Sequence, residues 1–345
     1  MSATTELSSR SRVLVVGYGL HGRAVVAALT ARDIEVVVVD DSPSEQALET
    51  AADAGVELRV SPDSDELRSL VKPASHLLPT PGLPAAHPVF AIAAERGVPV
   101  TSEFDLAGQW DDRPIVAITG TNGKTTVTTL VTQMLNAAGI ASTMAGNMEL
   151  PLVSAIDDPV AESFVVEASS FRLGHSATFS PAIGAWLNFA PDHLDVHGTL
   201  EAYEQAKARI WAHQPTDGIA IANAGDPAVL RNLPGRPTDL TFGADSIHAA
   251  SEAGTLTVLG QSLGGVEDLP RPLPHDVENY LAAALVAMTA GASPSVVSRV
   301  FGEFRGLPHR MELVARADGI SWFNDSKATT PHAVVAGVSG HRSVV

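Results

Sequence analysis

The 345-residue sequence contains no cysteine, only four lysines and no long apolar run. The absence of cysteine excludes disulfide bonds, thiolate zinc sites and a cysteine nucleophile. The longest apolar stretch, residues 281–288, is too short to cross a bilayer. The N-terminus lacks the basic and apolar regions of a signal peptide. We therefore expect a cytoplasmic protein with no membrane-inserted segment.

Positive charge is also scarce, because 22 Lys and Arg face 39 Asp and Glu and leave a net charge of −17. This charge repels phosphate backbones, so nucleic acid is not expected as a partner. Arginine supplies most of the cations. The few lysines are therefore candidates for chemistry that needs an amine: Lys72, Lys124, Lys207 and Lys327.

The composition, 45% hydrophobic and 18% charged with 28 Gly and 23 Pro, indicates a globular α/β protein. At about 150 residues per domain, the chain makes two domains and a remainder. The β-branched runs at 12–16 and 34–39, with a helical pattern over 21–31 between them, predict a βαβ unit with buried parallel strands.

A second strand–turn–helix unit begins at 115–119, after a segment over 108–114 that we interpret as a linker. The other expected elements are strands at 163–166, 182–187 and 218–222 and helices at 200–212 and 277–291. A Gly-Leu-Pro turn at 306–308 ends this part. The expected division is 1–113, 114–308 and a partial third domain, 309–345, with two strands and a helix.

The first glycine-rich turn, Gly17-Tyr18-Gly19-Leu20-His21-Gly22, fits G-x-G-x-x-G between a strand and a helix. Asp40 and Asp41 end the next strand. Such glycines let a phosphate approach the helix N-terminus, and the carboxylate binds ribose hydroxyls. This pattern leaves open an NAD(P) site, a site for another nucleotide and a Rossmann scaffold without a ligand.

The second turn is GTNGKTT at 120–126, called the phosphate loop below. It offers backbone N–H groups, a lysine for phosphate oxygens and a hydroxyl for Mg2+ at the start of a helix. Only the second half of the Walker pattern is present, since Ile118 occupies the position of its leading glycine. We interpret the turn as a phosphate-binding site.

Glu167 and Lys207 are charged candidates on predicted regular elements. Glu167 ends a strand at the sheet edge where ligands bind, so it would hold Mg2+ or a water, or it would cap the following segment. Lys207 shares a helix face with apolar residues. Its amine either extends to solvent or, at a lowered pKa, reacts with CO2 to form a carbamate that serves as an additional carboxylate ligand.

Residues 192–197, with the sequence DHLDVH, concentrate metal-capable side chains. His193 and His197 would suit zinc on a helix, but the flanking Pro191 and Gly198 favour a loop. A site for a hard cation and a solvated polar loop are the two interpretations that remain.

Further polar groups lie at element ends, namely Asn279, Arg310 and NDSKAT at 324–329. Asn279 opens an Ala- and Leu-rich helix, so it either caps that helix or faces a ligand. Arg310 and the NDSKAT segment follow the second domain, where a hinge between domains would face a nucleotide.

As a set, these segments resemble the Mur ligases of peptidoglycan synthesis. ITGTNGKTT is similar to the family's ATP loop, GN at 146–147 to its substrate loop and EASSFRL at 167–173 to its acidic strand end. The order continues with NFAPDHLDVHG, AYEQAKARIW, HDVENYLAA and GLPHRME. SSF after the glutamate and NDSKAT favour, within the family, the members that add D-glutamate. The similarity runs from about Arg12 to the end of the chain.

The resemblance implies an α/β protein with a Rossmann-like UDP-sugar domain, a central ATPase domain and a C-terminal Rossmann-like domain. The implied UDP-sugar residues are Gly19, Leu20, Asp40, Asp41, Thr80, Pro81, Gly82, Asn147 and His193. The implied ATP residues are Gly120, Thr121, Asn122, Gly123, Lys124, Thr125, Thr126, Asn279, Arg310 and Asp325. Thr125 and Glu167 would hold one Mg2+. His193 and carbamylated Lys207 would hold a second, and Lys327 and Thr329 would line the path to D-glutamate.

The implied catalytic residues are Lys124, Glu167, His193 and Lys207. In the implied reaction the L-alanyl carboxylate of UDP-N-acetylmuramoyl-L-alanine attacks the γ-phosphate of ATP and forms an acyl phosphate. The D-glutamate amine then displaces phosphate and forms an amide. Two Mg2+ ions let the three anions approach one another. A monomer is expected. The alternatives are a nucleotide- and UDP-sugar-binding module without turnover and a sister ligase that adds another amino acid.

The sequence departs from the family pattern at a few places. Asp276 stands where the family usually has Asn, and Thr80-Pro81-Gly82 replaces the more usual Ser-Pro-Gly. The C-terminal glycine- and lysine-containing loop, with the residues that grip the D-glutamate carboxylates, would lie beyond Val345. We therefore expect the ATP and UDP-sugar sites to be largely present and ligation by this chain to be weak or absent.

Overall fold

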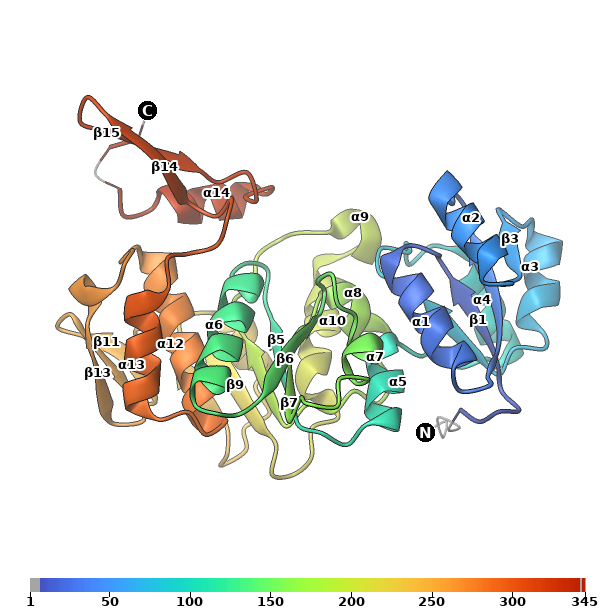
Figure 1. Cartoon of the computed structure of the whole chain (residues 1–345), viewed down its shortest axis with the longest axis horizontal. Coiled ribbons are helices and arrows are strands. Elements are labelled where there is room, and N and C mark those ends of the chain that lie inside the picture. The colour runs from blue at the N-terminus through green and yellow to red at the C-terminus, as the bar shows by residue number, and fades with distance from the viewer. Residues whose placement is uncertain (1–6, 342, 345) are drawn as a thin grey trace.

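The computed structural model describes residues 7–341, 343 and 344. The first six residues, which belong to the segment predicted to lack signal features, and the terminal Val345 lie outside the described residues. In Figure 1 the N-terminal sheet lies at one end of the molecule and a larger sheet in the middle. Two long helices and a C-terminal hairpin lie at the other end. The α/β class with mostly parallel sheets is confirmed.

The first sheet has four parallel strands in the order β3-β2-β1-β4. Its strands are β1 (Arg12–Val16), β2 (Glu35–Asp40), β3 (Leu58–Val60) and β4 (His76–Pro79). Its helices are α1 (Leu20–Thr30), α2 (Glu45–Asp53), α3 (Ser64–Val71) and α4 (Pro88–Arg96). Helices cover both faces of the sheet, so most of the Val-rich strands β1 and β2 is buried. This burial on both faces explains why their sequences are continuous apolar runs. The predicted βαβ unit is confirmed.

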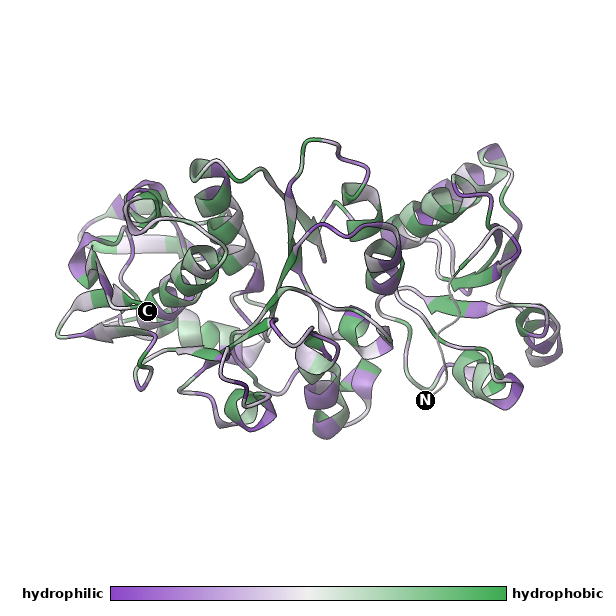
Figure 2. Cartoon of the chain, turned by 90° about the horizontal axis from the view of Figure 1, so that it is seen from below, coloured by the Kyte–Doolittle hydropathy of each residue, from purple (hydrophilic) through white to green (hydrophobic). Residues whose placement is uncertain are grey.

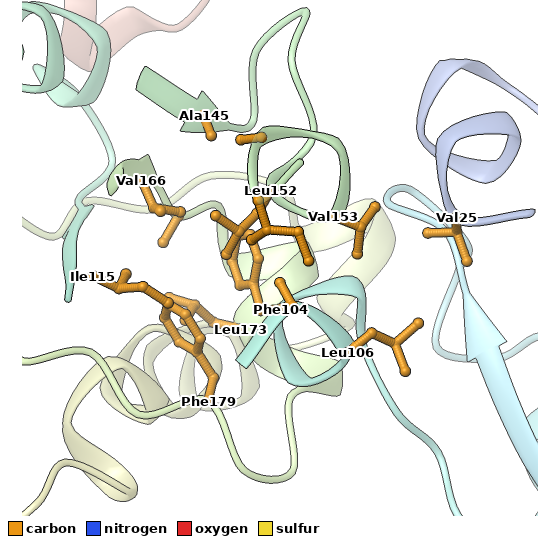
Figure 3. Packing of buried hydrophobic residues seen from close by; sticks show 14 of the residues in the cluster. Val25, Phe104, Leu106, Ile115, Ala145, Leu152, Val153, Val166, Leu173 and Phe179 are labelled. Atoms are coloured by element: carbon orange, nitrogen blue, oxygen red, sulfur yellow. The ribbon is translucent and has the colours of Figure 1, made fainter. Parts of the chain in front are cut away.

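Helix α5 (Glu103–Trp110) overlaps the segment interpreted as a linker. That interpretation is wrong for residues 108–110. A reciprocal cap between Ser102 and Asp105 starts the helix. The Phe104 side chain of this helix is fully buried, and its ring stacks on that of Phe179 with 4.7 Å between the ring centres. Figure 3 shows Phe104 close to Leu152, Leu173 and Phe179, which belong to the part of the chain around the central sheet. Only residues 111–114 are left as a connection.

The central sheet has six parallel strands in the order β10-β9-β8-β5-β7-β6. Its strands are β5 (Ile115–Thr119), β6 (Ser142–Gly146), β7 (Ser163–Glu167), β8 (Ile183–Trp186), β9 (Ile219–Asn223) and β10 (Leu240–Phe242). Its helices are α6 (Lys124–Ala137), α7 (Leu152–Ala155), α8 (Ser170–His175), α9 (Leu194–His197), α10 (Leu200–Ala212) and α11 (Pro227–Asn232). The predicted strands and the helix at 200–212 are confirmed, with ends shifted by at most one residue.

A three-stranded antiparallel sheet, not foreseen from the sequence, follows the central strands. It contains β11 (Ala249–Glu252), β12 (Thr255–Val258) and β13 (Gln261–Gly265) and leads through η1 (Val266–Asp268) into α12 (Pro274–Thr289) and α13 (Pro294–Glu303). Helix α12 begins three residues before the predicted start, because Pro274 is well suited to the first helical turn. Helices α12 and α13 pack against α6 and bury one apolar core. In Figure 2 hydrophobic residues line these helices and the strands behind them.

The last described part, residues 309–341 with 343 and 344, is called the C-terminal segment below. It contains the antiparallel hairpin β14 (Glu312–Ala317) and β15 (Ile320–Asn324), followed by α14 (Pro331–Val338). The expected two strands and one helix are therefore present. Over the described part of the chain, every helix is too short or too polar to span a membrane.

Candidate functional site

The phosphate loop connects the end of β5 to the start of α6, at the carboxyl edge of the central sheet. Gly123 is the N-cap of α6 with φ +83°, and a Cβ there would lie 2.4 Å from Oδ1 of Asn279. Only glycine therefore lets Asn279 approach the loop. Asn188, which follows β8, accepts from the Asn122 backbone N–H at 2.9 Å and donates to the Asn122 carbonyl at 3.2 Å. The sequence did not predict this pair of hydrogen bonds, although Asn188 belongs to the NFAPDH segment.

The Lys124 ammonium lies inside the loop and donates to the carbonyls of Gly120 and Thr121, each at 2.9 Å. Burial lowers the pKa of Lys124, and the nearby carboxylate of Glu167 opposes this shift. A lysine held in this way presents its charge at the mouth of the loop, where a phosphate would lie.

Glu167, at the end of β7, is buried beside this lysine. Its Oε1 accepts from Nδ2 of Asn147 at 3.1 Å. Its Oε2 is buried and has no hydrogen-bond partner within the described residues. An unpaired buried carboxylate oxygen is costly unless a cation binds it. The carboxylate thus fits Mg2+. The hydroxyl of Thr125, on the first turn of α6, is another oxygen donor, and it accepts from Nη2 of Arg310 at 2.9 Å.

Lys207, on α10, also reaches the loop. Its side chain is only 1% exposed, and its Nζ donates to the Gly120 carbonyl at 2.8 Å. The alternative in which the amine extends to solvent is therefore wrong. Burial and the charge of Lys124 lower the pKa of Lys207 well below its usual value, and Asp192 partly opposes them. A buried amine of low pKa is the neutral nucleophile that carbamate formation requires.

The DHLDVH segment is a short helix, α9, and the predicted loop is wrong for Leu194–His197. Gly198, with φ +77°, ends this helix. His193 precedes it in the left-handed region, at φ +52°, and its ring lies 4.8 Å from that of Phe171. Burial lowers the pKa of His193, with Asp192 opposing.

His197 is the other histidine of this segment. Its ring stacks on Phe171 at 5.4 Å, and its Nε2 lies 3.0 Å from Oγ of Ser170. No group of three His, Asp or Glu side chains is placed to hold a metal among residues 7–341. The zinc interpretation therefore has no support, and a cation here would need ligands of other types.

A cavity of about 410 Å³ lies between the phosphate loop, α12 and the C-terminal segment. Asn279 is internal to α12, so the capping alternative is wrong. The predicted residues that line the cavity are Asn122, Gly123, Thr126, Asn279, Arg310, Asp325 and Lys327. Thr329 is exposed and is not among the lining residues.

One further contact crosses this cavity. Nδ2 of Asn122 donates to Nδ1 of His332 in α14 at 2.7 Å. His332 was not predicted, because no spacing in the sequence relates it to the loop. The contact shows that α14 lies directly against the phosphate loop.

The first glycine-rich turn is built around close backbone contacts. A Cβ on Gly17 would lie 2.0 Å from Oγ1 of Thr80, and one on Gly22 would lie 2.1 Å from the Gly17 carbonyl. A Cβ on Gly19 would meet no described atom within 4 Å. Gly19 caps α1 without a side-chain hydrogen bond, and no acidic residue lies in the first turn. The N-terminus of α1 is therefore open to an anion.

The two aspartates after β2 have different contacts. Asp40 accepts from the backbone N–H groups of Tyr18 at 2.7 Å and Ser42 at 2.9 Å, so it fastens the turn. Asp41 accepts from Nε2 of His87 at 3.0 Å and lines a cavity of about 430 Å³ with His87 and three serines. Asp41 therefore faces an open site. His87 was not singled out from the sequence.

The remaining predicted UDP-sugar residues lie near these two sites. Leu20 and Gly82 are exposed and Pro81 is half-buried. The Asn147 backbone N–H donates to the Glu167 carbonyl at 2.8 Å, which fastens the GN loop to the end of β7. The first part of the chain contacts α9 through a hydrogen bond from the Ala85 N–H to the Val196 carbonyl. The glycine-rich turn and the phosphate loop thus belong to neighbouring bodies joined near His193.

Two family models match this chain. The Mur ligase middle domain matches residues 118–287, and the N-terminal domain of MurD-like Mur ligases matches residues 11–102. A curated protein of Frankia casuarinae, named UDP-N-acetylmuramoylalanine--D-glutamate ligase, is 41% identical over 96% of this chain and 72% of its own length. A protein of the same name from Mycolicibacterium smegmatis is 34% identical over 98% of this chain and 70% of its own. The chain belongs to the Mur ligase family.

Solved structures give this Mur ligase the same fold at low sequence identity. UDP-N-acetylmuramate:L-alanyl-gamma-D-glutamyl-meso-diaminopimelate ligase of Neisseria meningitides aligns with a TM-score of 0.58 at 17% identity, over 86% of this chain and 99% of that chain. UDP-N-acetylmuramate-alanine ligase MurC of Thermotoga maritima aligns with a TM-score of 0.54 at 21% identity, over 94% and 75%. The middle-domain match contains the phosphate loop, Glu167, His193 and Lys207 of this Mur ligase.

Proposed function

We propose that this Mur ligase joins D-glutamate to UDP-N-acetylmuramoyl-L-alanine at the expense of ATP, in the cytoplasmic synthesis of peptidoglycan precursors. Curated relatives of that activity, 34–41% identical over 94–98% of the chain, support the choice of D-glutamate. The observation that carries the proposal is the convergence of Lys124, Glu167, His193 and Lys207 on one phosphate loop.

In this proposal the loop and its neighbours bind ATP. The N–H groups at the start of α6 and the ammonium of Lys124 stabilise the negative charge that develops as the γ-phosphate passes to the L-alanyl carboxylate. Thr125 and Glu167 would hold one Mg2+, and His193 and carbamylated Lys207 a second. Bound Mg2+ supplies charge neutralisation between the reacting anions. Asn279, Arg310 and Asp325 line the cavity that would take the nucleotide.

In the carbamylation of Lys207, the neutral amine attacks CO2: an N–C bond forms, one C–O π bond of CO2 breaks and leaves its electrons on oxygen, and the nitrogen loses one proton to solvent. The product is a carbamate anion in place of the buried neutral amine. The lowered pKa of Lys207 supports this step, because an ammonium has no lone pair with which to attack.

The UDP-sugar would bind across the two bodies. The open N-terminus of α1 at Gly19 suits the diphosphate, and Asp41 in its cavity suits the uridine. Asn147, His193 and the segment 80–82 would contact the sugar side, and Lys327 and Thr329 the incoming amino acid. We also propose the domain division 1–113, 114–308 and 309–345 and a monomeric state.

The test is phosphate release from ATP by the purified intact protein, with UDP-N-acetylmuramoyl-L-alanine and D-glutamate present together or singly. We expect release only when both are present, together with an amide product. Equal activity with L-alanine or a diamino acid would reassign the substrate within the family. Saturable nucleotide binding without any amide product would support the binding module instead.

A further inference from the structure

Arg271, which precedes α12, connects that helix to the start of the C-terminal segment. Its Nε and Nη2 donate to the two oxygens of Asp276 at 2.5 and 2.6 Å. Its Nη1 donates to the carbonyls of Arg310 and Met311 at 2.7 and 2.8 Å. Because a bidentate carboxylate fixes the plane of the guanidinium, the Arg271–Asp276 pair directs the remaining donor at these two carbonyls.

The backbone that receives these hydrogen bonds is strained. His309 and Met311 both lie in the left-handed region, at φ +63° and +47°. Non-glycine residues keep such angles only where surrounding contacts impose them. Here the contacts come from Arg271 on the carbonyl side and from Asp325, whose Oδ1 accepts from the Met311 N–H at 3.0 Å. Residues 309–311, called the hinge below, are thus fixed from two sides.

The hinge carries Arg310, whose side chain reaches the phosphate loop. Its Nη2 donates to Oγ1 of Thr125 at 2.9 Å, and its charge acts on the ammonium of Lys124. Arg310 and the Arg271–Asp276 pair line the same cavity of about 410 Å³. A shift of the Arg310 backbone would therefore move its guanidinium away from the loop.

We propose that Arg271 and Asp276 are positioning residues that hold the hinge so that the Arg310 guanidinium faces the phosphates of a bound nucleotide. They act through Arg310 and do not touch the reacting atoms. The inference rests on the proposed function in one respect, namely that ATP occupies this cavity. Asp276 is suited to this role because it is almost fully buried on the first turn of α12, where its carboxylate has little freedom.

The experiment measures the Kd of a nonhydrolysable ATP analogue by calorimetry for the full chain and its variants. We expect Arg271→Met and Arg310→Lys each to weaken binding roughly tenfold, within the range of coupling between contacting residues. Because both changes disturb one guanidinium, the double variant should bind within about twofold of Arg310→Lys alone. If Arg271 only stabilised the fold, the two losses of affinity would instead multiply in the double variant.

Asp276→Asn is the second variant, because it keeps the side-chain shape while removing the charge that orients Arg271. It should also raise the Kd of the analogue, and it should have no further effect in a variant that already carries Arg310→Lys. Arg305→Met is the matched control, since the Arg305 guanidinium donates to the Gly302 carbonyl and has no hydrogen bond to the hinge among the described residues. We expect its Kd to be unchanged.

Wild-type affinity in Arg271→Met, or multiplying effects in the double variant, would overturn the proposal. Thermal unfolding of each variant shows whether it is folded at the temperature of the titration. Parallel assays of D-glutamate-dependent phosphate release keep the two hypotheses apart. If the wild type binds the analogue but forms no amide, the proposed function fails while the positioning role is still decided by the affinities.

Discussion

The Nζ of Lys207 donates to the carbonyl of Gly120 at 2.8 Å, although the two residues are 87 positions apart. This hydrogen bond fixes the amine of α10 against the first residue of the phosphate loop. The amine is buried and lies 4.6 Å from the ring centre of Tyr203. Its low pKa and its position together lead to the first prediction.

Ligase activity should depend on CO2 through Lys207. Removing CO2 from the buffer should lower the rate, and bicarbonate should restore it, because the carbamate supplies a ligand that the free amine lacks. Lys207→Ala should lose more than about tenfold in kcat, as expected for loss of a metal-site group. Lys72→Ala, which alters an exposed lysine, should keep wild-type activity. Unchanged activity of Lys207→Ala would remove the carbamate hypothesis.

Gly123→Ala should abolish nucleotide binding, whereas Gly97→Ala should not. Both glycines have positive φ, +83° and +67°, so both substitutions impose backbone strain of about 1–2 kcal/mol. Only at Gly123 would the new Cβ also collide with Asn279, since a Cβ at Gly97 meets no described atom within 4 Å. Calorimetric titration with an ATP analogue and urea unfolding separate the two effects. Equal affinities in both variants would show that the approach of Asn279 is unimportant for binding.

Local patterns in the sequence were enough for the elements that hold the site. Continuous Val-rich runs predicted β1 and β2, and the strand–glycine–helix pattern predicted β5 and α6. The antiparallel strands β11 to β13 were missed because each has only four or five residues without a continuous apolar run, and β13 ends in two glycines. The helix at 103–110 was partly predicted as a linker. The burial of Phe104 depends on tertiary contacts that the local sequence does not reveal, and the cap of the helix was not recognised.

The site itself was predicted as separate groups, and their partners were not. The spacing of residues in the chain does not reveal that Asn122 contacts His332, 210 positions away. The contact of Asp276 with Arg271 was likewise hidden, because Arg271 lies outside the motifs that carry the family resemblance. Asp40 and Asp41 were treated alike, whereas folding directs one toward the turn and the other toward His87. Contacts between elements, which depend on the whole fold, account for these differences.

Stability should fall between pH 6.5 and pH 4 because of His175. Its ring stacks on Phe90 at 5.1 Å across the two bodies, and burial lowers its pKa from 6.5 to about 4. In this window the unfolded chain binds a proton that the folded chain does not, so the free energy of unfolding decreases as pH falls. The full shift of the His175 pKa corresponds to a loss of at most about 3 kcal/mol in the free energy of unfolding.

Urea unfolding of the wild type and of His175→Phe at pH 7 and pH 4.5 measures this contribution. The phenylalanine retains the stacking ring but cannot bind a proton, so the variant should lose less stability on acidification. His213→Phe, at an exposed histidine, is the control. The prediction fails if the His175 variant and the wild type lose the same free energy between the two pH values.

Arg172→Met should destabilise the protein by about 3–5 kcal/mol, because it leaves a buried carboxylate without its counter-charge. Arg172 donates to Glu103, and both side chains are almost completely buried. Burial raises the pKa of Glu103, while Arg172 opposes the shift. Oε1 of Glu103 also accepts from the Leu152 N–H at 2.5 Å, so the pair fixes α5 against α7 and α8.

A matched comparison uses Arg68 and Glu95, an ion pair whose side chains are 43% and 55% exposed. Arg68→Met should change the free energy of unfolding by at most about 1 kcal/mol, because solvent screens exposed pairs. The double variant Arg172→Met/Glu103→Leu should recover part of the loss, since it removes the unpaired charge together with its partner. Denaturant unfolding at neutral pH gives all four values. If Arg172→Met costs no more than Arg68→Met, the Glu103–Arg172 pair does not hold α5 in place, and apolar contacts such as that of Phe104 with Phe179 must account for its packing.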